Sequence, residues 1–81
     1  MVVKFIVTAD KVVFGDKYFD DDYHRQVAIR NRVPESDVLG GGLADLEQKR
    51  IFGTSYGYGS YDPEVVRRLL PGWEVSDPCV Y

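Results

Sequence analysis

The apolar run VVKFIVTA at residues 2–9 most strongly limits what this chain can fold into. The run is rich in β-branched residues, and Lys4 is its only charge. This composition is typical of a buried β-strand. A second short strand is expected at residues 11–16, KVVFGD, after a hairpin turn at Asp10. We therefore expect the fold to be built around a β-sheet.

A helix is expected to follow, between the aspartates at residues 20–22 and Pro34. Asp21 or Asp22 can cap its start by accepting backbone N–H bonds, and Pro34 ends it because the residue before a proline avoids helical geometry. At 100° per residue, one arc of this helix collects most of its large apolar residues. The predicted core arc contains Phe19, Tyr23, Val27, Ile29 and Val33, and the opposite side contains His24, Arg25, Ala28, Asn31 and Arg32.

The second expected helix, DPEVVRRLLPG at residues 62–72, has clear start and stop signals. Asp62 can cap it, Pro63 suits its first position, and Pro71 with Gly72 stops it. Further strands are expected at residues 35–42, in a hairpin over residues 42–55, and at residues 73–77. The sequence predicts a single α/β or α+β domain over residues 1–81, with a mixed sheet of about five or six strands flanked by two helices.

The amino-acid composition limits which binding partners and which cellular compartment are expected. The formal net charge is −3, which argues against sequence-independent nucleic-acid binding. No run is long and apolar enough to cross a membrane. Cys79 is the single cysteine, so an internal disulfide or a cysteine-rich zinc site is excluded and a reducing, cytoplasmic compartment is expected. We expect a monomer or weak dimer that binds neither nucleic acid nor membranes.

His24 is the only histidine and the first candidate for chemistry. A lone histidine is usually a surface residue, but a helix start offers free N–H groups that favour an anion. A base beside such an anion site suits phosphoryl chemistry. Lys4 either points outward from a half-exposed strand or supplies a point charge for a phosphate.

Two glycine-rich stretches are candidates for close contacts with a ligand. The run at residues 40–42 either lets backbone approach closely or kinks the strand in a bulge. The stretch GTSYGYGS, residues 53–60, could form a nest of N–H groups that binds phosphate, with Thr54 and Ser55 adding hydroxyl donors. Its alternative is a flexible turn whose tyrosines pack on the core.

The three aspartates Asp20, Asp21 and Asp22 could ligate a hard cation, since such ions take carboxylate oxygens. Their spacing does not match a calcium loop, and consecutive side chains splay apart. A solvated helix start is therefore favoured, and no metal site is predicted.

Taken in order, these pieces resemble the Janus family of phosphohistidine phosphatases. The resemblance covers most of the chain and combines a strand that starts with lysine, a tyrosine-histidine pair at a helix start, a Leu-Gly-Gly-Gly run, a serine loop and a closing strand. The matching segments are KFIV from Lys4, Tyr23-His24, Leu39 to Gly42, FGTSYGYG at residues 52–59 and PGWEV at residues 71–75.

The resemblance implies a mixed sheet flanked by two helices and a role for each matched residue. His24 would be the base that activates water, and Lys4 would contact phosphate. Ser55 and Gly57 would bind phosphate largely through backbone amides. The substrate would be a phosphorylated protein or a small phosphoramidate, with no metal or organic cofactor.

The chain also departs from the family pattern in three places. Leu43 stands where the family often carries arginine, a further histidine is missing near Pro63, and residues 20–22 bring negative charge beside the histidine. Two other functions therefore stay open. One is a phosphate-binding module without turnover. The other is an interaction domain that uses the tyrosines Tyr56, Tyr58 and Tyr61.

Overall fold

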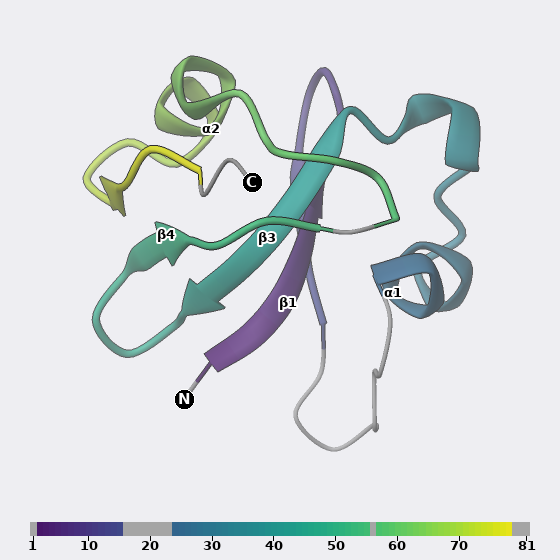
Figure 1. Cartoon of the computed structure of the whole chain (residues 1–81), viewed down its shortest axis with the longest axis horizontal. Helices are drawn as coiled ribbons and strands as arrows, with labels where there is room; N and C mark the ends of the chain where they lie inside the picture. Colours follow the sequence, from purple (N-terminus) through teal and green to yellow (C-terminus); the bar gives the residue numbers. More distant parts are fainter. Residues whose placement is uncertain (1, 16–23, 56, 79–81) are drawn as a thin grey trace.

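The computed structural model describes residues 2–15, 24–55 and 57–78, and Figure 1 draws the remainder as a grey trace. Within these residues, five strands form one mixed sheet in the order β2-β1-β3-β4-β5. All neighbours pair antiparallel except β4 and β5, which pair parallel. The predicted fold class is confirmed. The strands are β1 (Val2–Val7), β2 (Val12–Phe14), β3 (Gly40–Asp45), β4 (Arg50–Phe52) and β5 (Glu74–Val75).

Two α-helices, α1 (His24–Arg30) and α2 (Pro63–Leu69), lie on opposite sides of the sheet (Figure 1). The start of α2 matches its sequence signals, because the Asp62 side chain accepts the Glu64 N–H at 2.9 Å and a proline opens the helix. Neither helix, nor any other in the described part of the chain, is long and apolar enough to span a membrane.

The alternation along β1 sends its side chains to two separate cores. Val3, Phe5 and Val7 pack toward α2, whereas Ile6 packs toward α1. Lys4 therefore faces the same side of the sheet as Ile6. The α2 core consists of Val3, Phe5, Val7, Ala44, Ile51, Tyr61, Val66 and Val75, and the α1 core of Ile6, Val27, Ala28 and Val33.

The predicted core face of α1 is correct for Val27 and Val33, which are buried, but wrong for Ile29 and Ala28. Val27 and Ala28 are fully buried, but Ile29, which was expected in the core, is 63% exposed. His24 was placed on the outer side and is half-buried, because it shares the turn-spaced stripe with Val27 and Ala28. The described helix has only seven residues, so contact with the sheet sets its rotation. Phe19 and Tyr23 lie outside the described residues.

The end of α1 also differs from the prediction. Pro34 does not end the helix, because the chain already turns at Arg32, whose φ of 57° is left-handed. The Arg32 N–H bonds to Ile29 O at 3.1 Å and the Val33 N–H to Ala28 O at 2.9 Å, the paired bonds of a Schellman motif. This reversal carries Val33 back onto the α1 core.

The strand expected at residues 35–42 begins later than predicted. Residues Glu35–Asp37 form a short 3₁₀-helix, η1, because two backbone bonds close locally after Pro34. The Asp37 N–H bonds to Pro34 O at 2.9 Å, and the Val38 N–H bonds to Glu35 O at 3.1 Å. These bonds take the N–H groups that a strand would have used. Strand β3 starts only at the glycine run.

Candidate functional site

His24 opens α1 and reaches the sheet, where its Nε2 lies 2.8 Å from the carbonyl oxygen of Gly42. A carbonyl only accepts hydrogen bonds, so Nε2 carries the proton. In the neutral ring, Nδ1 is then the unprotonated nitrogen. No group in the described residues forms a hydrogen bond with Nδ1. His24 is therefore held in the tautomer that can accept a proton at Nδ1.

The pKa of His24 is lowered from its ordinary value of 6.5, chiefly because partial burial penalises the charged ring. The hydrogen bond to Gly42 acts in the opposite direction, and the positive charge of Lys4 lowers the pKa further. Among the described residues, Lys4 is the charged side chain that acts on the ring. His24 is accordingly neutral at pH 7, as a general base must be.

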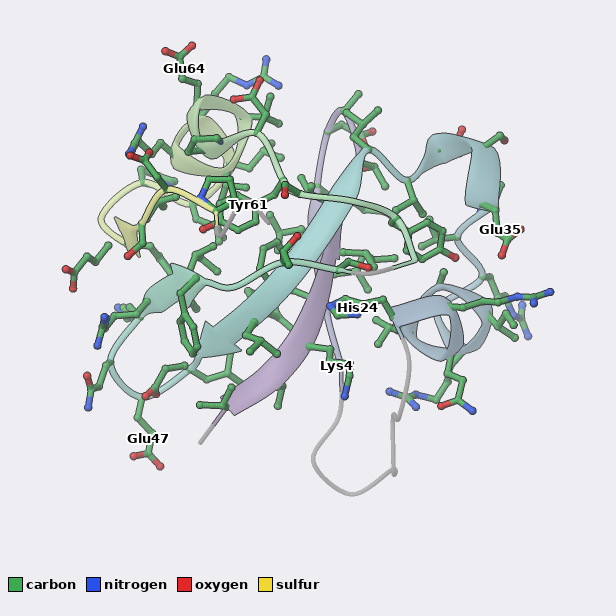
Figure 2. All side chains as sticks on the ribbon, viewed as in Figure 1. Lys4, His24, Glu35, Glu47, Tyr61 and Glu64 are labelled. Atoms are coloured by element: carbon green, nitrogen blue, oxygen red, sulfur yellow. The ribbon has the colours of Figure 1, made fainter. Side chains whose placement is uncertain are left out.

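Lys4 lies on the His24 side of the sheet (Figure 2). Its partner in β3 is Leu43, which faces the same side. Lys4 is half-buried, and its ammonium forms no ion pair within the described part of the chain. The site thus combines a neutral imidazole with an ammonium whose charge is not neutralised by a described carboxylate.

Gly41 lies beneath His24 and the loop that contains Ser55. A Cβ at this position would be 2.5 Å from Phe5 O, 3.1 Å from His24 Cδ2 and 3.4 Å from Ser55 Cβ. Only glycine therefore fits between β1, the imidazole and the serine. The pairing of β3 with β1 runs without interruption from Val2–Asp45 to Val7–Gly40, so the alternative of a bulge at the glycine run is wrong.

The serine loop, residues 53–55 and 57–60, contains several internal hydrogen bonds. The Oγ of Ser55 accepts the Tyr58 N–H at 3.1 Å, and Ser55 O accepts the Gly59 N–H at 2.9 Å. Gly59 O in turn accepts the Gly41 N–H at 3.2 Å. Ser55 is only 2% exposed. The Tyr58 and Gly59 amides are therefore used inside the loop and do not contribute to the anion nest that was one alternative for this stretch.

Gly57 stands at the exposed tip of this loop, and a Cβ there would meet nothing within 4 Å. No described group accepts its N–H, so this amide could serve an anion. The hydroxyl of Thr54 is not free, because its Oγ1 lies 3.0 Å from Ser60 Oγ. The Gly57 amide is thus a predicted donor that is exposed and has no described acceptor.

His24 and Ser55 both lie against Gly41, Lys4 lies on the same side of the sheet as His24, and Gly57 is exposed at the tip of the serine loop. The aspartates at residues 20–22 lie outside the described residues. Among the described residues, no three His, Cys, Asp or Glu side chains are grouped as metal ligands. A groove of about 500 Å³ opens elsewhere, between residues 8–11 and 32–39, and no predicted site residue lines it.

Sequence reasoning missed the Gly42 carbonyl, although the Leu-Gly-Gly-Gly run marked the segment that provides it. The interaction-domain alternative also used Tyr61 as a contact residue. Tyr61 is 2% exposed and packs against Phe5, with ring centroids 5.5 Å apart. Its hydroxyl donates to Ser76 O at 2.5 Å. Tyr61 is a core residue, so that part of the interaction-domain alternative is wrong.

Comparisons of this chain with protein-family models, curated proteins and solved structures return no match. The function must therefore be inferred from the fold and the site themselves.

The lowered pKa of His24 predicts a specific pH dependence of stability. Below pH 6.5 the unfolded chain protonates this histidine, whereas the folded chain resists protonation until a lower pH. The unfolded state then binds more protons, so the free energy of unfolding falls as pH drops through this window and is fully retained above it. Urea unfolding at about pH 7.5 and about pH 5.5 should show this loss.

The matched control is His24→Gln, which keeps an N–H donor for Gly42 O but cannot be protonated in this range. The difference between wild type and this variant isolates the contribution of the histidine. An equal loss of stability in both proteins would show that His24 is not the group responsible.

Proposed function

We propose that this chain hydrolyses a phosphoramidate bond, with phosphohistidine in proteins as its substrate class. The observation that carries the proposal is the hydrogen bond from His24 Nε2 to Gly42 O, which leaves Nδ1 as a base beside the Lys4 ammonium. A neutral base and a cation on one face meet the two needs of phosphoryl transfer to water. The ordered sequence resemblance to phosphohistidine phosphatases supports the same choice.

In the proposed reaction, water attacks phosphorus and its proton passes to Nδ1 of His24. The P–N bond breaks, and its electron pair goes to the imidazole nitrogen of the substrate. The proton gained by His24 returns to that leaving nitrogen or to bulk water, which restores the base. Lys4 and the Gly57 N–H stabilise the charge on the phosphoryl oxygens. The products are histidine and inorganic phosphate.

A second candidate is a module that binds a phosphorylated side chain without turnover. Two observations favour it. Leu43 lies beside Lys4 on the same face, so no second cation adjoins the lysine there among the described residues. The Tyr58 and Gly59 amides of the serine loop are also committed to internal bonds. Both features leave fewer groups to stabilise the charge of a transition state. Weak binding of a phosphorylated side chain requires less stabilisation than turnover does.

Phosphate release from matched phosphohistidine and phosphoserine peptides separates the two candidates. We expect turnover of the phosphohistidine peptide and little of the phosphoserine peptide, whose oxygen leaving group is harder to expel. Binding of both peptides without release of phosphate would instead support the binding module. No binding and no release would contradict both.

Lys4→Gln tests the proposed phosphate contact. Loss of a charge-assisted contact is worth roughly 1.5–3 kcal/mol, so kcat/KM for phosphohistidine should fall about 10- to 100-fold. Lys49→Gln is the matched control, because Lys49 is an exposed lysine in the turn between β3 and β4. Steady-state kinetics of both variants provide the comparison. Equal effects of the two substitutions would rule out a specific role for Lys4.

A further inference from the structure

Tyr58 joins three parts of the molecule: the serine loop, the α1 core and η1. Its ring packs on the α1 core formed by Ile6, Val27, Ala28 and Val33. Its backbone N–H donates to Ser55 Oγ at 3.1 Å, and its hydroxyl donates to Glu35 Oε1 at 3.3 Å. One side chain thus links the serine loop to the α1 core and to η1.

The contacts differ in strength. Glu35 Oε1 also lies 3.1 Å from Arg25 Nε, in the residue next to His24, but the two side chains are 58% and 71% exposed. Exposed ion pairs contribute little, typically below about 1 kcal/mol. The half-buried aromatic ring supplies most of the anchoring, because burial of its apolar area stabilises the contact more than an exposed ion pair does. The hydroxyl and Glu35 fix the direction in which the ring lies.

The serine loop in turn lies beside Gly41, the glycine that also adjoins the His24 ring. Gly59 O accepts the Gly41 N–H at 3.2 Å, which fixes the loop to the strand under His24. Gly41 lies directly against both the imidazole and the Ser55 side chain. A loop that moved away from α1 would therefore admit water to the ring of His24.

We propose that Tyr58 is a positioning residue that holds the serine loop against α1 and so keeps His24 partly buried. Its catalytic consequence rests on the function proposed above, whereas its effect on the His24 environment does not. Tyr58 therefore has a role in the site, whereas the sequence alone indicated only a surface contact or a core residue.

The charges around His24 predict how the site responds to loss of Tyr58. Lys4 faces the ring from β1, Arg25 follows it on α1, and β3 contributes only Gly41, Gly42 and Leu43 at this point. Removing the tyrosine leaves Lys4 and the β3 residues in place, and Glu35 loses its hydroxyl bond but keeps its exposed ion pair with Arg25. Added water would weaken the burial penalty, which is the main cause of the lowered pKa. The pKa of His24 should then rise toward 6.5.

The test is an NMR titration of the His24 ring in wild type, Tyr58→Ala, Tyr58→Phe and Val38→Ala. Val38 is the matched control, since it is partly buried against the same core but lies outside the serine loop. We expect a raised pKa in Tyr58→Ala, a value near wild type in Tyr58→Phe, which keeps the ring, and no change in Val38→Ala. An unmoved pKa in Tyr58→Ala, or an equal shift in Val38→Ala, overturns the proposal.

If Tyr58→Ala does not fold, Tyr58→Leu replaces it with the same expectations, because it keeps apolar volume without the hydroxyl or the length of the ring. Kinetics of the same variants separate this inference from the proposed function. Misplacing the loop should lower kcat for phosphohistidine about tenfold, with recovery in Tyr58→Phe. A shifted pKa in a protein without turnover would refute only the function, and normal pKa with normal turnover in Tyr58→Ala would refute only the positioning role.

Discussion

His24→Gln is expected to lower phosphate release from phosphohistidine by about 10²- to 10⁴-fold, the usual contribution of a general base. Glutamine can keep the N–H donor that His24 offers to the Gly42 carbonyl, so the local contact with β3 need not be lost. What glutamine cannot supply is the unprotonated Nδ1 that takes the proton from water. The loss should therefore appear in kcat more than in KM.

The control for this experiment is the fold of the variant itself. Urea unfolding at neutral pH should give a free energy of unfolding close to that of wild type, because His24 is neutral there in both folded and unfolded states. A stable variant that keeps turnover within a few-fold of wild type would contradict the role of His24. A stable variant with the expected loss would leave the base as the simplest explanation.

Gly41→Ala is expected to reduce the free energy of unfolding by about 3 kcal/mol, toward the upper end of overpacking costs. The new Cβ would lie 2.5 Å from the carbonyl oxygen of Phe5, a backbone atom in the strand paired with β3. It would also meet the His24 ring at 3.1 Å. Backbone in a central strand cannot move aside as a flexible side chain can, so the sheet and the imidazole must both shift.

Gly57→Ala is the matched control, because a Cβ there would meet nothing within 4 Å. Its stability should stay within about 0.5 kcal/mol of wild type, as at other unconstrained surface sites. Chemical denaturation of both variants gives the two free energies. If Gly41→Ala were as mild as Gly57→Ala, the close approach of β1, His24 and Ser55 around this glycine would be refuted.

The elements that the sequence predicted well carry their signals locally. Helix α2 has its aspartate cap, its opening proline and its Pro-Gly stop within eleven residues, and all lie where expected. Strand β1 is an apolar run whose composition alone already indicates a buried strand. Such signals act over a few residues and do not require knowledge of the tertiary fold.

The buried face of α1 could not be predicted from local sequence signals. The predicted arc was drawn over residues 19–33, whereas the described helix runs only from His24 to Arg30. Val33 reaches the core through the reversal at Arg32, outside the helical period. In so short a helix, packing against Ile6 decides which residues are buried, and this contact is not local in sequence.

In the candidate site, too, some features could be predicted from the sequence and others could not. His24 could be selected because it is the single histidine, and Lys4 because it is the single charge in an apolar strand. The hydrogen bond to Gly42 O could not, since it joins residues eighteen positions apart in the chain. The hydrogen bond from the Tyr58 N–H to Ser55 Oγ also depends on the closed shape of the loop, which composition alone does not define.

The most direct test of His24 as the base in phosphohistidine hydrolysis is the pH dependence of phosphate release by the wild-type chain, corrected for hydrolysis in buffer alone. We expect enzymatic turnover whose kcat/KM rises with pH and levels off at a pKa below 6.5, the ordinary value for histidine. Phosphate release no faster than in buffer at any pH, or a rate that does not depend on a group titrating below 6.5, would contradict the proposed function.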